Sequence, residues 1–223
     1  MKFLTWFRVS VFLLAFAWTA FGQADNQGSV GYGILLDNSF SMIPAAETVK
    51  FFGEEFVRQV PADSEISLFA FKSSGFIAYF DLVQSWGKDK EKFINKIDGL
   101  GPKGGKTELR TAIDRAGKKF LSKDEHFAER ILLIVTDGDD KVSSISVEDL
   151  IANLKSEKVK VFVVGLVNNL PVDRKDKKGQ ITDARKNATD FLTRLADSTG
   201  GAAIFPKDGE NITHIVTTLL NQK

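Results

Sequence analysis

The sequence contains no cysteine, and this absence excludes several features at once. No disulfide can form, so the chain must be held together by core packing alone, which 223 residues can provide. A lipoprotein anchor, which needs a cysteine, is excluded as well. Histidine is almost as scarce, since only His126 and His214 occur and neither has a spaced partner. A zinc site is therefore not expected.

A strong net charge is also missing. The chain carries 30 basic and 29 acidic residues, a formal net charge of +1. No overall field therefore favours nucleic acid or an acidic membrane surface. With 43% hydrophobic and 26% charged residues, the composition is typical of one ordinary globular domain. The choice of partner must come from a local site.

The N-terminus has the features of an export signal. Lys2 and Arg8 precede an apolar run from Val11 to Trp18, which is short against the roughly 20 residues that span a bilayer. Small residues in Ala20-Phe21-Gly22 predict cleavage after Gly22. We therefore expect a signal peptide over residues 1–22, an exported protein (periplasmic or extracellular), and no stable membrane span after cleavage. An uncleaved signal anchor remains an alternative.

Beyond the signal, apolar runs alternate with segments of helical period. Lys72 to Gly75 link two expected strands, and this link is too short for a parallel crossover, so it predicts an antiparallel hairpin. Residues 168–187 are polar, rich in Lys and Arg, and unpatterned, which predicts a long loop. Strands are expected at 29–37, 66–71, 76–83, 130–137, 159–167 and 202–205, and helices near 45–60, 93–100, 109–120, 146–154, 191–196 and 211–219.

This alternation indicates an α/β fold. We expect a three-layer, doubly wound, Rossmann-like sheet that is mostly parallel, with one antiparallel edge strand, and a single domain over residues 29–223. In such folds ligands bind beyond the carboxyl ends of the strands. The loops that follow the strands are therefore the place to look for function.

Oxygen ligands follow two of the expected strands. Asp37, Ser39 and Ser41 occupy every second position, so in an extended loop they point the same way. Asp137 follows a buried strand, and Thr107 begins the helix between the two loops. Two carboxylates and three hydroxyls form an all-oxygen set that suits Mg²⁺ or Mn²⁺, with Ca²⁺ also possible. The alternative is that these side chains only brace a loop and cap a helix.

These motifs resemble those of a von Willebrand factor type A domain with a metal-ion-dependent adhesion site. The family's Asp-x-Ser-x-Ser matches Asp37, Ser39 and Ser41, its threonine before a Leu-x-x-Ala-Ile helix matches Thr107, and its Thr-Asp-Gly aspartate matches Asp137. The resemblance implies the same fold and a metal held by these five residues. It also implies that the metal captures an Asp or Glu carboxylate of a protein partner.

Two features bear on the edge of this site. Lys106 stands where a second glycine often precedes the family's threonine, so it could repel a cation or attract an acidic partner. The Lys-rich segment 168–187 follows a strand and is expected to border the same face. Together they suggest a positive border that favours anionic partners.

Other functions fit the sequence less well. A Walker A loop needs four residues between its glycines, and Gly101 and Gly105 have three between them. An aspartyl phosphotransferase needs an acid two positions after Asp37, where Ser39 stands. An EF-hand needs a glycine where Met42 stands. We therefore expect a binding module and no enzyme. A scaffolding domain with a structural ion and a Mg²⁺-dependent phosphohydrolase with Asp37 as nucleophile remain alternatives.

Overall fold

A computed structural model of the chain describes residues 30–74, 77–101, 107–121, 127–175 and 179–222. The signal peptide expected over residues 1–22 and the side chain of Lys106 lie outside the described residues. Across the described ranges, no helix has the length and hydrophobicity needed to cross a bilayer.

The centre of the molecule is a six-stranded sheet with the strand order β3-β2-β1-β4-β5-β8. Its neighbours run parallel except for β2 and β3, which form the antiparallel hairpin at the edge that the short link predicted. The predicted fold class is confirmed. The strands of this sheet are β1 (Val30–Asp37), β2 (Glu65–Ser74), β3 (Ile77–Gly87), β4 (Glu129–Thr136), β5 (Val159–Gly165) and β8 (Ala203–Ile204).

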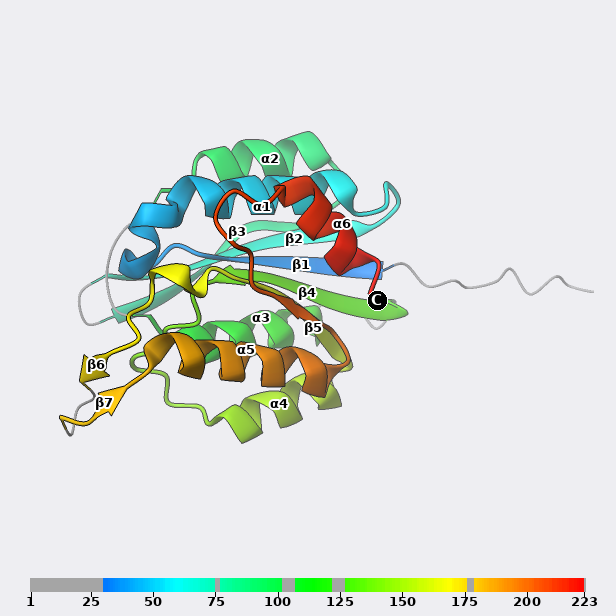
Figure 1. Ribbon diagram of the computed structural model, residues 1–223. Coiled ribbons are helices and arrows are strands. Elements are labelled where there is room, and N and C mark those ends of the chain that lie inside the picture. Colours follow the sequence, from blue (N-terminus) through cyan, green and yellow to red (C-terminus); the bar gives the residue numbers. More distant parts are fainter. Residues whose placement is uncertain (1–29, 75–76, 102–106, 122–126, 176–178, 223) are drawn as a thin grey trace, which may run out of the picture.

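Helices cover both faces of the sheet and make three layers (Figure 1). One face carries α1, α2 and α6, and the other carries α3, α4 and α5. The helices are α1 (Ala46–Gln59), α2 (Lys90–Asp98), α3 (Leu109–Leu121), α4 (Val147–Ser156), α5 (Ala184–Thr199) and α6 (Ile212–Leu220).

Local sequence explains where several helices begin and end. The side chains of Asp89, Ser146, Asp183 and Asn211 each accept a hydrogen bond from a backbone N–H in the first turn of α2, α4, α5 and α6. Each of these residues therefore satisfies a donor that the helix itself leaves unpaired. Helix α5 ends at Gly200, whose φ of 78° is left-handed and favours glycine.

Strand β4 shows how the two cores are built. Its residues from Ile131 to Val135 are all fully buried, because helices cover the sheet on both faces. Ile131, Leu133 and Val135 pack toward α1 and α6, while Leu132 and Ile134 pack toward α3, α4 and α5. The continuous apolar run in the sequence is therefore divided between two separate cores.

The prediction of an unpatterned loop over residues 168–187 was wrong in part. The segment contains a short helix η2 (Val167–Asn169), a small hairpin of β6 (Arg174–Lys175) and β7 (Ile181–Thr182), and the first turn of α5. Ala184 and Ala188 are buried and continue the apolar stripe of α5 to Leu192. The Asp183 cap and the four-residue spacing of the alanines indicate this helix. The charged residues between the alanines led to the wrong prediction of a loop.

The order of the strands determines where a ligand can bind. The chain leaves β1 toward β2 on one side and later returns to β4 on the other side, so the topology switches between β1 and β4. Asp37 ends β1, and Asp137 directly follows β4. The short helix η1 (Phe40–Ala45) and hairpin β6–β7 lie at this end, opposite the C-terminus (Figure 1). In open α/β sheets ligands bind at such a switch point.

Candidate metal centre

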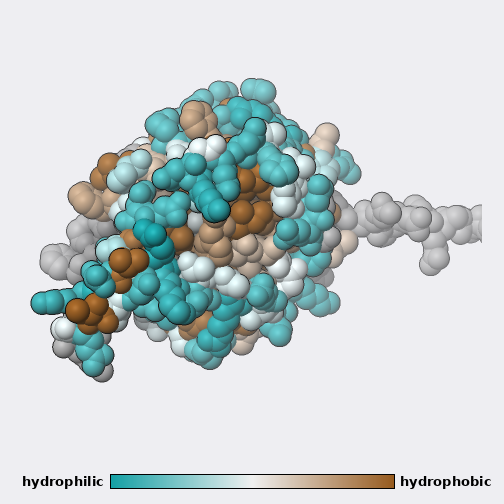
Figure 2. All heavy atoms as spheres, viewed as in Figure 1, coloured by the Kyte–Doolittle hydropathy of each residue, from teal (hydrophilic) through white to brown (hydrophobic). Residues whose placement is uncertain are grey.

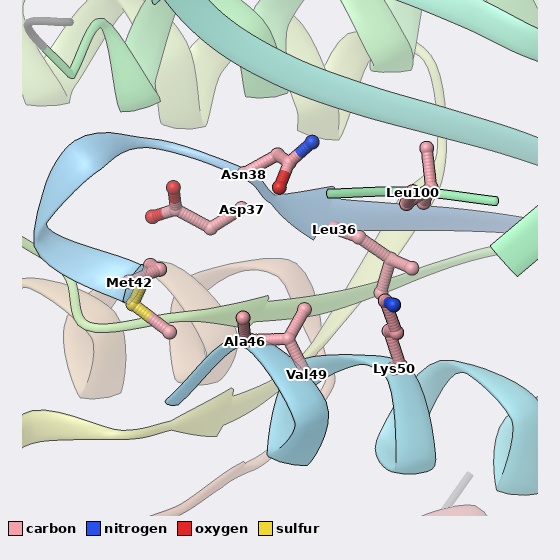
Figure 3. Close-up of a pocket in the computed structure, with 8 residues that line it drawn as sticks. All are labelled: Leu36, Asp37, Asn38, Met42, Ala46, Val49, Lys50 and Leu100. Atoms are coloured by element: carbon pink, nitrogen blue, oxygen red, sulfur yellow. The ribbon is translucent and has the colours of Figure 1, made fainter. Parts of the chain in front are cut away.

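Asp37 is buried at the end of the central strand β1, with 1% of its surface exposed. Its Oδ1 accepts the backbone N–H of Ser39 at 3.0 Å, and its Oδ2 accepts the hydroxyl of Thr136 at 2.5 Å. Figure 3 shows its carboxylate inside the turn that the chain makes toward Met42, pointing away from Asn38. The cavity drawn there has a volume of only about 10 Å³ and is too small for a ligand.

Two serines connect Asp37 to the second acidic residue. Ser39 is fully buried and its side chain hydrogen-bonds to Asp37. The hydroxyl oxygens of Ser39 and Ser41 share a hydrogen bond of 3.2 Å, and the side chain of Ser41 hydrogen-bonds to Asp137. The structure therefore brings four of the five predicted residues together in one continuous chain of hydrogen bonds.

The loop after β4 holds Asp137 in place. Its Oδ1 accepts the backbone N–H of Asp139 at 2.9 Å, and only 2% of its surface is exposed. Gly138 makes this tight turn possible because its φ is 78°, in the left-handed region. The N–H of Gly138 donates to the hydroxyl of Thr136 at 3.1 Å. Thr136 thus joins the loop to Asp37.

The two buried carboxyl groups disfavour each other's charge. Burial raises the pKa of Asp37 to about 7, and repulsion from Asp137 adds to this effect against the hydrogen bonds from Ser39 and Thr136. Burial also raises the pKa of Asp137. Within the described part of the chain, no basic side chain bonds to Asp37. The charge of Lys141 lowers the pKa of Asp137 in part, but burial outweighs it, and Asp37 has no such partner there.

Thr107, the fifth predicted residue, lies beside the same loop. Its backbone carbonyl accepts the N–H of Lys141 at 3.0 Å, and 2% of its surface is exposed. This contact joins the start of α3 to the loop after β4. No hydrogen bond between the Thr107 hydroxyl and the other four predicted residues occurs among the described contacts. Thr107 is therefore near the loop, but its described contacts do not include it in the chain of hydrogen bonds from Asp37 to Asp137.

Asp139, two residues after Asp137, has very different neighbours. Arg174 of β6 donates from Nη1 to Oδ1 at 2.5 Å and from Nη2 to Oδ2 at 3.0 Å, and Lys141 Nζ lies 3.1 Å from Oδ2. Burial alone would raise the pKa of Asp139, but the hydrogen bonds and charges of Arg174 and Lys141 outweigh it and lower that pKa. Of the residues expected to form a positive border, Arg174 of segment 168–187 pairs with an acid beside the site.

Sequence reasoning missed three residues of this centre. Thr136 was visible as the hydroxyl residue at the end of a buried strand, next to Asp137. Asp139 was visible only as one of several acids in the loop. Arg174 lies 35 residues farther along the chain, in a segment whose sequence showed no pattern. Its pairing with Asp139 depends on the hairpin that carries it.

The donor set fits a hard divalent cation. It consists of carboxylate and hydroxyl oxygens, which Mg²⁺, Mn²⁺ and Ca²⁺ prefer over nitrogen and sulfur. A cation between Asp37 and Asp137 would offset the repulsion that now raises the pKa of Asp37. Among the described residues, no group of three acidic or histidine side chains is arranged to hold a metal ion. The set therefore depends on its hydroxyl groups as much as on its two acids.

Comparison with known families gives one clear match. The family model of the von Willebrand factor type A domain matches residues 33–218, which include all five predicted site residues. A comparison with curated proteins found no match.

Solved structures agree on the fold. An aerotolerance-related membrane protein from Bacteroides fragilis matches with a TM-score of 0.65 at 19% identity, covering 87% of this chain and 98% of that chain. BatB, a conserved hypothetical protein from Bacteroides thetaiotaomicron, has a TM-score of 0.62 at 18% identity, with coverage of 87% and 98%. A von Willebrand factor type A structure from Catenulispora acidiphila has a TM-score of 0.61 at 15% identity, with coverage of 86% and 42%.

Proposed function

This chain belongs to the von Willebrand factor type A domain family, and we propose that it is an exported module that binds another protein through a divalent cation. Domains of this family generally serve protein interaction. The residues proposed to hold the cation are Asp37, Ser39, Ser41, Thr107 and Asp137. The module has no enzymatic activity of its own.

One observation supports this proposal above all others. Asp37 ends β1 and Asp137 directly follows the neighbouring strand β4 at the switch point of the sheet, and each is at most 2% exposed. Two buried carboxylates at one position are unfavourable unless they share a proton or bind a cation. Ser39 and Ser41 add oxygen donors between them. A cation bound between the two carboxylates would remove this energetic cost.

Mg²⁺ or Mn²⁺ fits the oxygen set best, and Ca²⁺ is a further candidate. A bound ion would supply positive charge and a coordination position that accepts a carboxylate oxygen of the partner. The chain contributes few anionic ligands, because two of its proposed ligands are serines and one is a threonine. The ion is therefore left with charge that a further acidic oxygen can satisfy.

The surroundings of the site favour a protein partner over a small ion. Exposed hydrophobic side chains flank both loops: Phe40 and Ile43 in η1 are 64% and 44% exposed, and Val142 is 38% exposed. Val172 and Ile181 of the hairpin segment are 52% and 69% exposed, and Figure 2 shows hydrophobic side chains on this protruding hairpin. Apolar surface around a polar centre is typical of protein interfaces.

The domain limits and the export signal belong to the same proposal. We infer a signal peptide over residues 1–22 and a mature domain over residues 29–223. Mass spectrometry of the protein secreted by its host would locate the new N-terminus. A mature chain that begins after Gly22 supports the proposal, whereas retention of Met1 to Gly22 would favour the uncleaved anchor.

Calorimetric titration of the domain with Mg²⁺, Mn²⁺ and Ca²⁺ tests the metal site. We expect binding heat from the unaltered domain, and none from a variant that combines Thr107→Ala with Asp137→Ala. Asp114→Asn is a matched control. Asp114 is also buried, but its carboxylate pairs with Lys118 and Asn153 on the side of α3 and α4.

A second measurement separates binding from scaffolding. The metal-loaded domain and the Asp37→Ala variant are compared for capture of peptides that carry a single Asp or Glu. Capture that requires both the metal and Asp37 supports the adhesion function. Equal capture by both proteins would favour a scaffolding domain whose ion is structural. Metal-dependent release of phosphate from a generic phosphate ester would instead favour the phosphohydrolase.

A further inference from the structure

Arg174 connects the β6–β7 hairpin to the loop of the metal centre. Its guanidinium forms two parallel hydrogen bonds with the carboxylate of Asp139, a geometry that fixes direction as well as distance. Only 7% of the Asp139 side chain is exposed, against 32% of Arg174. The backbone N–H of the same Asp139 donates to Asp137. The hairpin is thus two residues from a proposed metal ligand.

The hairpin itself is braced so that Arg174 is presented to this loop. The hydroxyl of Thr182 donates to the backbone carbonyl of Arg174 at 3.2 Å across the two strands. At the base, Arg185 donates to the carbonyl of Asn168 at 2.5 Å, and the N–H of Ala184 donates to the carbonyl of Pro171 at 3.2 Å. The first turn of α5 therefore supports the hairpin.

Contacts with two cations fix the orientation of the Asp139 carboxylate. Asp139 and Arg174 line an open cavity of about 290 Å³, together with Phe191 and Ala188 of α5. The Asp139–Arg174 pair therefore borders open space on one side. Arg174 and Lys141 are the cations that hold it in its present direction.

We propose that Arg174 is a positioning residue that keeps the Asp139 carboxylate turned away from the metal centre, so that an acidic partner finds a free coordination position. This inference rests on the proposed metal-dependent function. Asp139 is the nearest acid in sequence to Asp137, yet no three acidic side chains are arranged to hold a metal ion in the part of the chain that the structure describes. The Arg174–Asp139 pair formed by the hairpin explains why Asp139 does not join Asp37 and Asp137 in such a group.

The physical reason lies in the number of negative ligands. Each added carboxylate strengthens the binding of a hard divalent cation. It also satisfies charge that would otherwise attract a carboxylate from outside. A freed Asp139 would therefore make the site bind metal more tightly and bind the partner more weakly. Loss of structure would weaken both, so the two effects can be told apart.

The next residue provides a matched control. Asp140 also pairs with an arginine, since Arg110 Nε donates to its Oδ2 at 2.7 Å. Arg110 is partly exposed like Arg174, at 24% against 32%. No described contact joins the Arg110–Asp140 pair to the Asp137 carboxylate. Removal of Arg110 therefore changes the local charge equally but leaves the direction of Asp139 unaltered.

The experiment measures Mn²⁺ affinity by calorimetry and acetate binding by the broadening of its ¹³C resonance near bound Mn²⁺. For Arg174→Ala we expect Mn²⁺ to bind about tenfold more tightly, as for an added carboxylate ligand, and acetate to bind several-fold more weakly. Arg110→Ala should change neither value. Adding Asp139→Asn to Arg174→Ala should restore acetate binding, and Arg174→Lys should lie in between.

Other outcomes decide against the inference. Mn²⁺ and acetate binding that weaken together, by the roughly 10–100-fold typical of lost outer-shell support, would make Arg174 a simple brace of the loop. No change in either would also overturn it. If Arg174→Ala does not fold by circular dichroism, Arg174→Lys provides a weaker form of the same comparison, with tighter Mn²⁺ binding and weaker acetate binding than in the unaltered domain. Absence of Mn²⁺ binding in the unaltered domain would overturn the proposed function, and this inference with it.

Discussion

Two pairs of carboxyl groups near the loop after β4 show opposite electrostatics. Asp137 faces Asp37, and burial raises the pKa of both. Asp139 and Asp140 each bond to an arginine, and the pKa of Asp139 is lowered. All four side chains are mostly buried, at no more than 9% exposed. Burial therefore does not distinguish the two pairs. A direct hydrogen bond from an arginine, which only Asp139 and Asp140 accept among the described contacts, does.

This contrast separates two uses of the same side chain. An acid that the fold pairs with its own arginine contributes to structure, because its charge is already satisfied. An acid that faces another acid and has no arginine bonded to it gains most from a proton or a cation that comes from outside. The acid without a bonded cation, Asp37, therefore marks the candidate functional site at this end of the sheet.

The largest expected effect comes from Gly138, the turn residue between Asp137 and Asp139. Its φ of 78° is unfavourable for a side chain, and a Cβ there would lie 2.9 Å from Ala188 and from Leu192. We expect Gly138→Ala to lower the free energy of unfolding by roughly 3–5 kcal/mol through strain and overpacking. Urea denaturation of the metal-free protein measures this loss.

Gly200 is the matched control for this change. It has the same φ of 78°, but a Cβ there would meet nothing within 4 Å. Gly200→Ala should therefore cost only the backbone strain, about 1–2 kcal/mol. Equal losses at the two positions would show that the crowding around Gly138 does not matter.

The next effect in size is stabilisation by metal, which should involve the Asp37–Asp137 pair and not Asp139 and Asp140. At a free Mg²⁺ concentration 100 times the dissociation constant, unfolding should cost about 2.7 kcal/mol more. For a domain of this length, that raises the melting temperature by roughly 5–10 °C. Asp137→Asn should abolish the increase, and Asp114→Asn should retain it. A thermal shift that survives Asp137→Asn would place the metal elsewhere.

The sequence predicted the fold and the position of the loops with the candidate metal ligands for related reasons. Continuous apolar runs such as that of β4 need cover on both faces, and this requirement alone implies three layers. Asp37, Ser39 and Ser41 follow a strand end in a short motif, so their common direction follows from local geometry. The structure brings them together with Asp137, as expected. Whether they hold a metal stays a prediction.

Other parts of the centre depend on contacts that a local pattern does not contain. Arg174 reaches Asp139 only because two short strands and the first turn of α5 place it there. Both strands are only two residues long, too short for an alternating pattern to be visible. The Asp183 cap and the buried Ala184 were available signals, but the surrounding charges suggested a loop. Long-range pairing of charges was the part that could not be read from sequence.

A smaller effect should appear without any metal, in the pH dependence of stability. The pKa of Asp37 is about 7 in the folded protein against a usual 3.8. A raised pKa means that its favourable contribution is present below pH 4 and is lost as the pH rises to about 7. With a chelator present, Asp37→Asn should therefore be more stable than the unaltered protein at pH 7, by at least about 1 kcal/mol, because each pKa unit is worth about 1.4 kcal/mol.

Urea denaturation at several pH values between 4 and 8 measures this difference. The gap between Asp37→Asn and the unaltered protein should be absent near pH 4 and should widen toward pH 7. A gap that stays constant with pH would mean that Asp37 is already compensated by a group of the chain itself, which would weaken the case for a cation.

The smallest effect concerns Asp139 and should have the opposite pH dependence. Its pKa is lowered by Arg174 and Lys141, so its contribution is present above its usual pKa of 3.8 and is lost as the pH falls below it. Arg174 and Lys141 are 32% and 46% exposed, and water screens their charges. Asp139→Asn should therefore cost only about 1 kcal/mol at pH 7.

Because Asp37→Asn stabilises and Asp139→Asn destabilises the metal-free protein at that pH, two similar changes in one centre should shift the denaturation midpoint in opposite directions. Shifts of the same sign would mean that both acids have the same role.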